Sequence, residues 1–204
     1  MFKNRIDAGS MLAAKLIRYK DSSGIVLAVP RGGVPVAYVV AKELGFPLEL
    51  VLTKKIGHPS NKEYAIGAAS LTDYFVSSPH EVTTAYVAQE LIAVRHRLLA
   101  MQQKFMGHGK PTSLTGKTVI VVDDGMATGN TLLSTVQLIK KEKPENIIIA
   151  VPVASASAVQ KLMNEGVEVI TLGIPPGFNS VGAYYQNFNE VTDDEVIFYL
   201  NANK

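Results

Sequence analysis

The sequence predicts an α/β protein in which a mostly parallel sheet is flanked by helices. Short apolar runs alternate along the chain with longer stretches in which apolar residues recur every three or four positions. The run at residues 119–122 contains only β-branched residues, which is typical of a strand buried on both faces. Strands that alternate with helices favour a parallel sheet covered on both sides.

Local signals define the first three elements. A stripe of apolar residues predicts a helix over residues 8–19, and Gly24 ends it. The apolar run at 25–29 predicts the first strand. A second helix is expected over 34–44 and is closed by Gly45, because glycine is common just after a helix C-terminus.

The middle of the chain is more polar, and its elements are shorter until a long helix begins. Thr83 or Thr84 is the expected N-cap of that helix. In order, the sequence predicts a strand at 48–52, a polar loop at 57–62, a short strand at 65–71, a helix over about 83–105 and a linker at 107–116.

The second half repeats the alternation of strands and helices. The expected elements are a strand at 119–122, a helix containing residues 132–139, a strand at 147–153, a helix over 154–164 and a last core strand at 167–172. No internal repeat or clear domain boundary interrupts the chain. We therefore expect residues 1–204 to form a single domain.

The composition favours an ordinary soluble protein without a nucleic-acid or membrane partner. Of 204 residues, 47% are hydrophobic and 19% are charged, and the net charge is only +2. The absence of cysteine excludes disulfides, thiol catalysis and cysteine-bound metal. Because the N-terminus has no apolar core of a leader peptide and no run approaches membrane-spanning length, a cytoplasmic location is expected.

The most informative segment is residues 119–131, which read VIVVDDGMATGNT. Asp123 and Asp124 follow the predicted strand, and a loop rich in glycine and threonine leads into a helix. Backbone N–H groups at a helix N-terminus form a site for phosphate. Two adjacent acids suit a pair of hydroxyl groups or a metal ion. A sugar 5-phosphate with free ribose hydroxyls satisfies both requirements.

Other common motifs fit poorly. Gly125 and Gly129 are one residue too close for a Walker loop, and Asn130 stands where lysine is required. The dinucleotide fingerprint is absent at this position. The four histidines show no metal-ligand spacing. An ordinary strand–turn–helix with acidic caps is the alternative interpretation.

Two further predicted strand ends carry groups that suit an anion. Arg31, Gly32 and Gly33 follow the first strand, and Lys54 and Lys55 follow the second. Arginine offers a forked donor to phosphate, and glycine lets backbone amides approach a ligand closely. Each segment alone could be a solvated loop. In open parallel sheets, however, ligands bind beyond the carboxyl ends of the strands, where these segments are expected to meet.

Residues 119–131 resemble the signature of the type I phosphoribosyltransferases: a hydrophobic run, two acids and then x-x-x-T-G-x-T. In that family the loop after the first strand binds pyrophosphate, and a basic pair after the second strand precedes a mobile loop. The whole chain also resembles a bacterial group of predicted phosphoribosyltransferases whose acceptor is undefined. That group shares the opening Arg5-x-Asp7-Ala8-Gly9 and a closing pattern over 178–188 and 193–196.

The resemblance implies Mg²⁺-dependent transfer of phosphoribose from phosphoribosyl pyrophosphate to a nucleobase-like nitrogen acceptor, with release of pyrophosphate. Asp123 and Asp124 would hold the ribose hydroxyls and orient the metal, partly through water. Together with Lys54 and Lys55 they are the expected catalytic residues. The expected substrate-binding residues are Arg31, Gly32, Gly33, Gly125, Ala127, Thr128, Gly129, Asn130 and Thr131.

The resemblance also suggests two covering segments. Residues 57–65 are the candidate lid, and residues 174–188 are the candidate hood over the acceptor. Aromatic residues in the hood could stack on a base or belong to the core. Ala127 stands where hypoxanthine–guanine enzymes carry a base-contacting aspartate, so that activity is disfavoured. Adenine-like, pyrimidine or unusual acceptors remain.

Two function classes remain open: an enzyme, or a non-catalytic sensor of nucleotides or phosphoribosyl pyrophosphate on the same fold. The basic residues on the pyrophosphate side favour the enzyme. A homodimer is also expected, because the long helix carries an apolar a/d seam that could join two subunits or pack on its own domain. The seam consists of Val87, Leu91, Val94, Leu98, Met101 and Phe105.

Overall fold

The computed structural model describes residues 1–77, 79–107 and 111–203, and a five-stranded parallel sheet lies at its centre. Every neighbouring pair in this sheet is parallel, so the predicted fold class is confirmed. The central strand is β6, and all of its residues are buried. The order across the sheet is β2 (Leu48–Leu50), β1 (Gly24–Ala28), β6 (Thr118–Val122), β7 (Asn146–Val153) and β8 (Glu168–Gly173).

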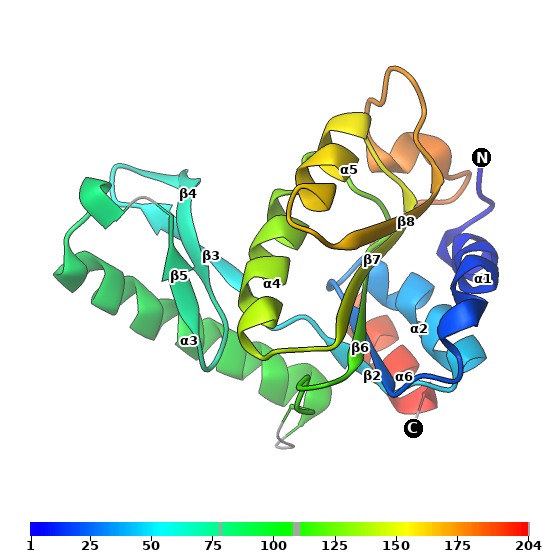
Figure 1. The fold of residues 1–204 in the computed structure, drawn as a ribbon, viewed down its shortest axis with the longest axis horizontal. Helices are drawn as coiled ribbons and strands as arrows, with labels where there is room; N and C mark the ends of the chain where they lie inside the picture. Colours follow the sequence, from blue (N-terminus) through cyan, green and yellow to red (C-terminus); the bar gives the residue numbers. More distant parts are fainter. Residues whose placement is uncertain (78, 108–110, 204) are drawn as a thin grey trace.

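Helices cover both faces of this sheet (Figure 1). Side chains of β6 alternate between the two faces, so Ile120 and Val122 join one apolar cluster while Val119 and Val121 join the other. The first face is covered by α1 (Arg5–Leu16), α2 (Gly33–Leu44) and α6 (Asp193–Ala202), and the second by α4 (Asn130–Lys141) and α5 (Ala156–Met163).

Two predicted helix caps are confirmed, and one helix was not predicted. Gly45 ends α2 with a left-handed φ of 70°. The Thr83 hydroxyl accepts a hydrogen bond from the Tyr86 amide, 3.2 Å away, at the start of α3 (Thr84–Met106). The missed helix is α6, which begins with a capping box formed by Thr192 and Glu195.

A second sheet of three antiparallel strands lies beside the central sheet, and α3 runs from it back along the molecule (Figure 1). The strands are β3 (Lys54–His58), β4 (Asn61–Ala69) and β5 (Tyr74–Val76). We call these strands and α3 the arm. Two linkers connect the arm to the central sheet, and residues 108–110 of the predicted second linker lie outside the described residues.

The predicted polar loop at 57–62 is wrong, while the role of residues 57–65 as a lid stays a prediction. Residues 59–60 form the turn of a hairpin, and the rest of the segment belongs to β3 and β4. The strands approach closely at Gly57, where an added Cβ would lie 2.4 Å from the Lys62 carbonyl oxygen. Irregular pairing around Gly57 accommodates a polar sequence that does not alternate like an ordinary strand.

The apolar seam of α3 packs within the chain. Leu91, Val94 and Leu98 are buried against Ile56 and Ile66 of the hairpin. The buried residues of the seam therefore belong to the core of the arm and are not free to join two subunits, and the dimer itself stays a prediction. Glutamates at Leu91 and Leu98 would disrupt the arm rather than release a folded monomer.

Leu98→Ala is expected to destabilise the arm by about 2–5 kcal/mol, because the side chain is fully buried and the hairpin cannot close over the cavity. Denaturant unfolding monitored by circular dichroism measures this loss. Leu99→Ala is the matched control, since Leu99 is 47% exposed on the same helix. Equal losses for the two variants would contradict the assignment of the seam to the core.

Three short 3₁₀ helices complete the regular structure of the described chain: Ile17–Tyr19, Pro79–Glu81 and Val181–Tyr184. Among the described residues, no helix is both long enough and apolar enough to cross a membrane.

Candidate functional site

Two of the predicted site segments lie against each other because their strands are neighbours. β1 and β6 pair in register, with Ala28 opposite Val122, so the turn at 30–33 lies against the acids that follow β6. The Pro30–Arg31 peptide bond in this turn is cis. A Cβ on Gly32 would lie only 2.2 Å from Asp124 Oδ2. The absence of a side chain there allows the turn to contact the acid.

The acids themselves occupy an unfavourable electrostatic position. Burial raises the pKa of Asp123 well above its ordinary value, and the neighbouring charge of Asp124 raises it further. Burial also raises the pKa of Asp124, while the Arg5 guanidinium opposes that shift. Arg5 contacts Asp124 Oδ2 through Nε at 2.9 Å and Nη2 at 2.8 Å. Two half-buried carboxyls that cost stability are typical of a functional site.

The glycine-rich loop after the acids leads directly into α4. Gly129 is the N-cap of α4, with a left-handed φ of 72°, and Ala127, Thr128, Asn130 and Thr131 are exposed. The exposed loop thus presents a helix N-terminus to solvent, as an anion site requires.

Neighbouring side chains hold this loop in place. The Ser155 hydroxyl donates to the Ala127 carbonyl at 2.6 Å. Lys161 Nζ donates to the Thr128 carbonyl at 2.9 Å and to Asn130 Oδ1 at 2.8 Å. The side-chain oxygen of Asn130 is therefore directed toward Lys161, and the predicted role of this residue in phosphate binding rests on its backbone.

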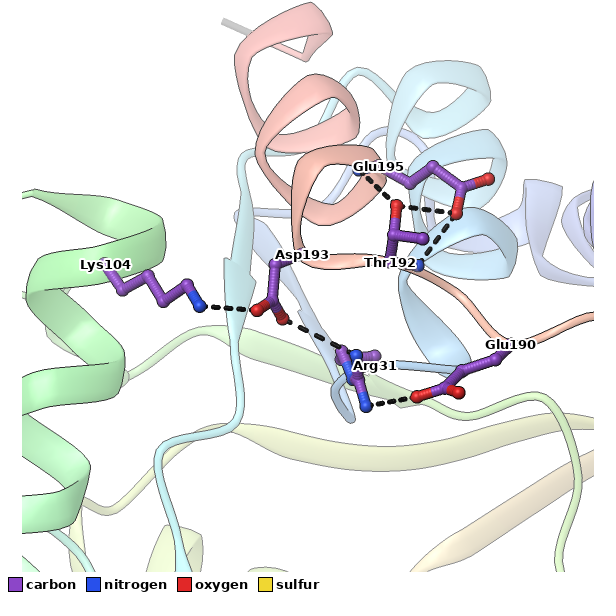
Figure 2. A network of polar contacts seen from close by, with 6 residues as sticks. All are labelled: Arg31, Lys104, Glu190, Thr192, Asp193 and Glu195. Atoms are coloured by element: carbon purple, nitrogen blue, oxygen red, sulfur yellow. Dashed lines mark hydrogen bonds and ion pairs between the residues drawn. The ribbon is translucent and has the colours of Figure 1, made fainter.

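Carboxylates hold Arg31 at the mouth of the site (Figure 2). Its Nη2 contacts Glu190 Oε1 at 2.5 Å, and its Nη1 lies 3.7 Å from Asp193 Oδ1. Asp193 in turn pairs with Lys104 of α3, so the network joins the turn after β1 to both α6 and the arm. These side chains are partly or largely exposed, and such pairs contribute only about 0–1 kcal/mol each. An incoming anion could replace the carboxylates at little cost.

Adjoining cavities connect the predicted site residues. One of about 550 Å³ is lined by Arg5, Arg31, Gly32, Asp123 and Asp124, among others. A second, of about 350 Å³, shares Arg31 with the first and adds Lys54 and Thr131. A third, of about 730 Å³, shares Lys54 and Thr131 and contains Lys55 and Asn130. The structure thus brings together the three segments predicted to bind anions, which are the turn at 30–33, Lys54 with Lys55, and the loop at 125–131. Their roles in binding stay predictions.

The predicted hood is fixed to the acids and to the N-terminus. The Tyr185 hydroxyl donates to the Asp124 carbonyl at 2.6 Å, and burial raises the pKa of Tyr185. Phe2 pairs with the same segment. Tyr185 therefore belongs to the core, whereas Phe178 and Tyr184 stack 5.5 Å apart and are only partly buried.

Sequence reasoning missed the residues that support the site from elsewhere in the chain. Arg5, Ser155, Lys161 and Tyr185 all contact predicted site residues. Arg5 and Tyr185 had a signal, since they belong to the opening and closing patterns of the resembling bacterial group. Neither pattern indicated a contact with Asp124, because Arg5 and Tyr185 lie 119 and 61 positions from it in the sequence.

A parallel sheet with an acid pair and a glycine-rich loop at its carboxyl edge defines a class, the α/β proteins that bind ligands at that edge. Within this class, the model of the phosphoribosyl transferase domain matches residues 2–172. The chain belongs to this family.

One curated relative carries a matching description, and two solved structures share the fold. "Putative phosphoribosyl transferase Rv0571c" of Mycobacterium tuberculosis is 35% identical over 98% of the chain, which spans only 46% of that relative. TT1426 of Thermus thermophilus superposes with a TM-score of 0.89 at 35% identity, covering 98% of this chain and 97% of that one. A Neisseria gonorrhoeae protein solved with ppGpp shares the fold, with a TM-score of 0.53 at 17% identity and coverages of 98% and 93%.

Proposed function

We propose that the chain transfers phosphoribose from phosphoribosyl pyrophosphate to a nucleobase-like nitrogen acceptor and releases pyrophosphate. One observation supports this above all: a half-buried acid pair, an arginine turn and a glycine-rich helix N-terminus lie around adjoining cavities. A ligand with a phosphate at one end, hydroxyls in its middle and a diphosphate at the other end matches this order of groups. Family membership supports the same reaction class.

Mg²⁺ fits the donors that the chain offers. Among the described residues no group of three or more histidine or acidic side chains forms a metal site. Mg²⁺ is usually bound by one or two carboxylates together with substrate phosphates, and Asp123 and Asp124 supply such a pair. We propose that these acids hold Mg²⁺, partly through water, and that the ion neutralises charge on the diphosphate.

The chain's own residues supply the remaining chemistry. Asp123 and Asp124 hold the ribose hydroxyls, and backbone N–H groups of 127–131 bind the 5-phosphate, where the α4 dipole adds about 0.3–1 kcal/mol per charge. Arg31, the amides of Gly32 and Gly33, and Lys54 or Lys55 stabilise the charge that develops on the leaving pyrophosphate. Bond cleavage at the anomeric carbon gives a cation-like state, and the acceptor nitrogen attacks its opposite face.

Water must be excluded from this cation-like carbon. We propose that the arm, rather than a loop, is the lid that excludes water, since Lys54 and Lys55 begin β3. The acceptor would lie under the hood, where Phe178 and Tyr184 offer partly exposed rings. Ala127 provides no carboxylate for a hypoxanthine or guanine edge, which favours adenine-like, pyrimidine or unusual acceptors.

Pyrophosphate release with Mg²⁺ across a panel of nucleobases tests the proposal. Turnover on one base, with slow hydrolysis to ribose 5-phosphate as a side reaction only, is the expected result. Tight binding of phosphoribosyl pyrophosphate with no turnover on any base would instead identify a sensor. Failure to bind it at all would exclude both functions.

Two wider expectations belong to this proposal. We propose that the protein acts in the cytoplasm as a homodimer, because active phosphoribosyltransferases are commonly dimers. Any dimer would use a surface other than the buried seam of α3. Light scattering at micromolar concentration tests the dimer, and a monomeric protein would contradict it.

Arg31→Gln is expected to weaken pyrophosphate binding by about tenfold, which corresponds to about 1.4 kcal/mol, and to spare ribose 5-phosphate. Lys54→Ala or Lys55→Ala should act in the same direction, because these groups serve the opposite end of the ligand from the loop at 127–131. Glu190→Gln should strengthen pyrophosphate binding, since it removes a carboxylate that competes for Arg31. Titration calorimetry with each ligand measures the three effects. Equal losses for both ligands in Arg31→Gln would contradict the division of the site.

A further inference from the structure

We propose that Arg5 is a positioning residue that holds the carboxylate of Asp124 in place within the ligand site. The identity of the ligand in this inference rests on the proposed function, whereas the contacts of Arg5 are observed in the structure. Both contacts from Arg5 end on Oδ2 of Asp124, at 2.9 and 2.8 Å. Neither contact from Arg5 uses Oδ1, so Arg5 itself does not compete with a ribose hydroxyl for this oxygen.

Arg5 is itself fixed on its other sides. Its side chain is only 11% exposed. Its Nη1 donates to the Asn189 carbonyl at 2.7 Å, and its guanidinium lies 3.9 Å from the centroid of the Phe188 ring. Such an arrangement uses the planar shape of the guanidinium as well as its charge, which a lysine ammonium cannot reproduce.

The location of Arg5 connects these contacts to the ligand. Arg5 and Phe188 line the same cavity of about 550 Å³ as Asp123, Asp124 and Gly32. Because Asp124 Oδ2 lies against Gly32, Arg5 fixes the separation between the acid that would hold the ribose and the turn that would hold the pyrophosphate. The hood contributes Phe188 and the segment after it contributes Asn189, so the same arginine joins the N-terminus, the hood and the acids.

The first experiment needs no ligand. In Arg5→Gln, we expect NMR relaxation dispersion to detect microsecond-to-millisecond motion at the amides of Asp124 and Gly32, because the carboxylate has lost its clamp. Arg18→Gln is the matched control, since Arg18 is an exposed arginine that pairs with Glu168 on the surface. If the amides of Asp124 and Gly32 show no more microsecond-to-millisecond motion in Arg5→Gln than in Arg18→Gln, the proposal is overturned, whether or not the protein is an enzyme.

The second experiment measures ligand affinity by calorimetry. Arg5→Gln should weaken ribose 5-phosphate binding at least tenfold and pyrophosphate binding by a clearly smaller factor, because only the first ligand contacts Asp124 directly. Arg5→Lys keeps the charge without the fork and should recover only part of the affinity. Millimolar guanidinium should restore ribose 5-phosphate binding in Arg5→Ala. A folded Arg5→Gln with unchanged ribose 5-phosphate affinity, or with equal losses for both ligands, would overturn the proposal.

Phe188→Leu provides a variant for the case in which Arg5→Gln fails to fold. It keeps the ion pair and removes the ring beneath the guanidinium, so the same selective loss is expected at a smaller size, about threefold. If Phe188→Leu leaves the affinity for ribose 5-phosphate unchanged and the Asp124 amide shows no relaxation dispersion, the result counts against the proposal. A wild-type protein that binds no ribose 5-phosphate would end the proposed function, and the dispersion experiment would still decide the role of Arg5.

Discussion

The double variant Asp123→Asn with Asp124→Asn is expected to bind phosphoribosyl pyrophosphate and ribose 5-phosphate at least about 100-fold more weakly than the wild type, while keeping the fold. The substitutions preserve shape and remove the two charges that would hold the ribose hydroxyls and Mg²⁺. A loss of this size corresponds to about 2.7 kcal/mol, which is reasonable for two charged contacts to one ligand. Calorimetry with and without Mg²⁺ measures it.

The same variant should be at least as stable as the wild type at pH 7. Burial raises the pKa of both carboxyls, and a carboxyl whose pKa is raised in the folded state costs stability at any pH above its ordinary pKa. Asparagine removes that cost, and its amide oxygen can still accept from Arg5. The melting temperature at pH 7 should therefore hold or rise, and the gain should disappear as the pH falls below the ordinary aspartate pKa.

Asp21→Asn serves as the control, since Asp21 is exposed and far along the chain from the acids. It should change neither affinity nor melting temperature. Unchanged ligand affinity in the double variant would show that the acids are assigned wrongly. If the double variant no longer unfolds cooperatively, Asp123 and Asp124 have a structural role instead.

The central sheet was predictable because each of its strands is a short apolar run with its own local signal. β6 and β7 consist almost entirely of β-branched or apolar residues, and each begins one residue before its predicted range and ends where predicted. The hairpin was not predictable in the same way. Residues 58–61 include types that favour turns, and the first two residues of β3, Lys54 and Lys55, are exposed, so no alternation indicated a strand.

The carboxyl-edge location of the site followed from topology, whereas its internal contacts did not. Once β1 and β6 are neighbours, the turn at 30–33 must approach the acids. The clamp on Asp124 comes from the N-terminus, and the carboxylates on Arg31 come from the start of α6 and the residues just before it. These contacts join residues more than 100 positions apart, and no local pattern identifies such partners.

Gly33→Ala is expected to weaken ribose 5-phosphate binding by about 100-fold, because the new methyl group has no room between α2 and β6. It would lie 2.7 Å from the Val122 carbonyl oxygen and 2.8 Å from the Asp123 Cα, both of them backbone atoms that no rotamer change can move. Relieving the overlap must displace Asp123, and the loss of its charged contact to the ribose hydroxyls would cost about 2.7 kcal/mol, which corresponds to about 100-fold in affinity. The strain should also lower stability by about 1–3 kcal/mol.

Gly173→Ala at the end of β8 is the matched control, since its Cβ would meet nothing within 4 Å. Calorimetry and thermal unfolding of the two variants test the prediction, and a Gly33→Ala protein that binds and melts like Gly173→Ala would show that the close contact between the turn and the acids has no part in holding the site.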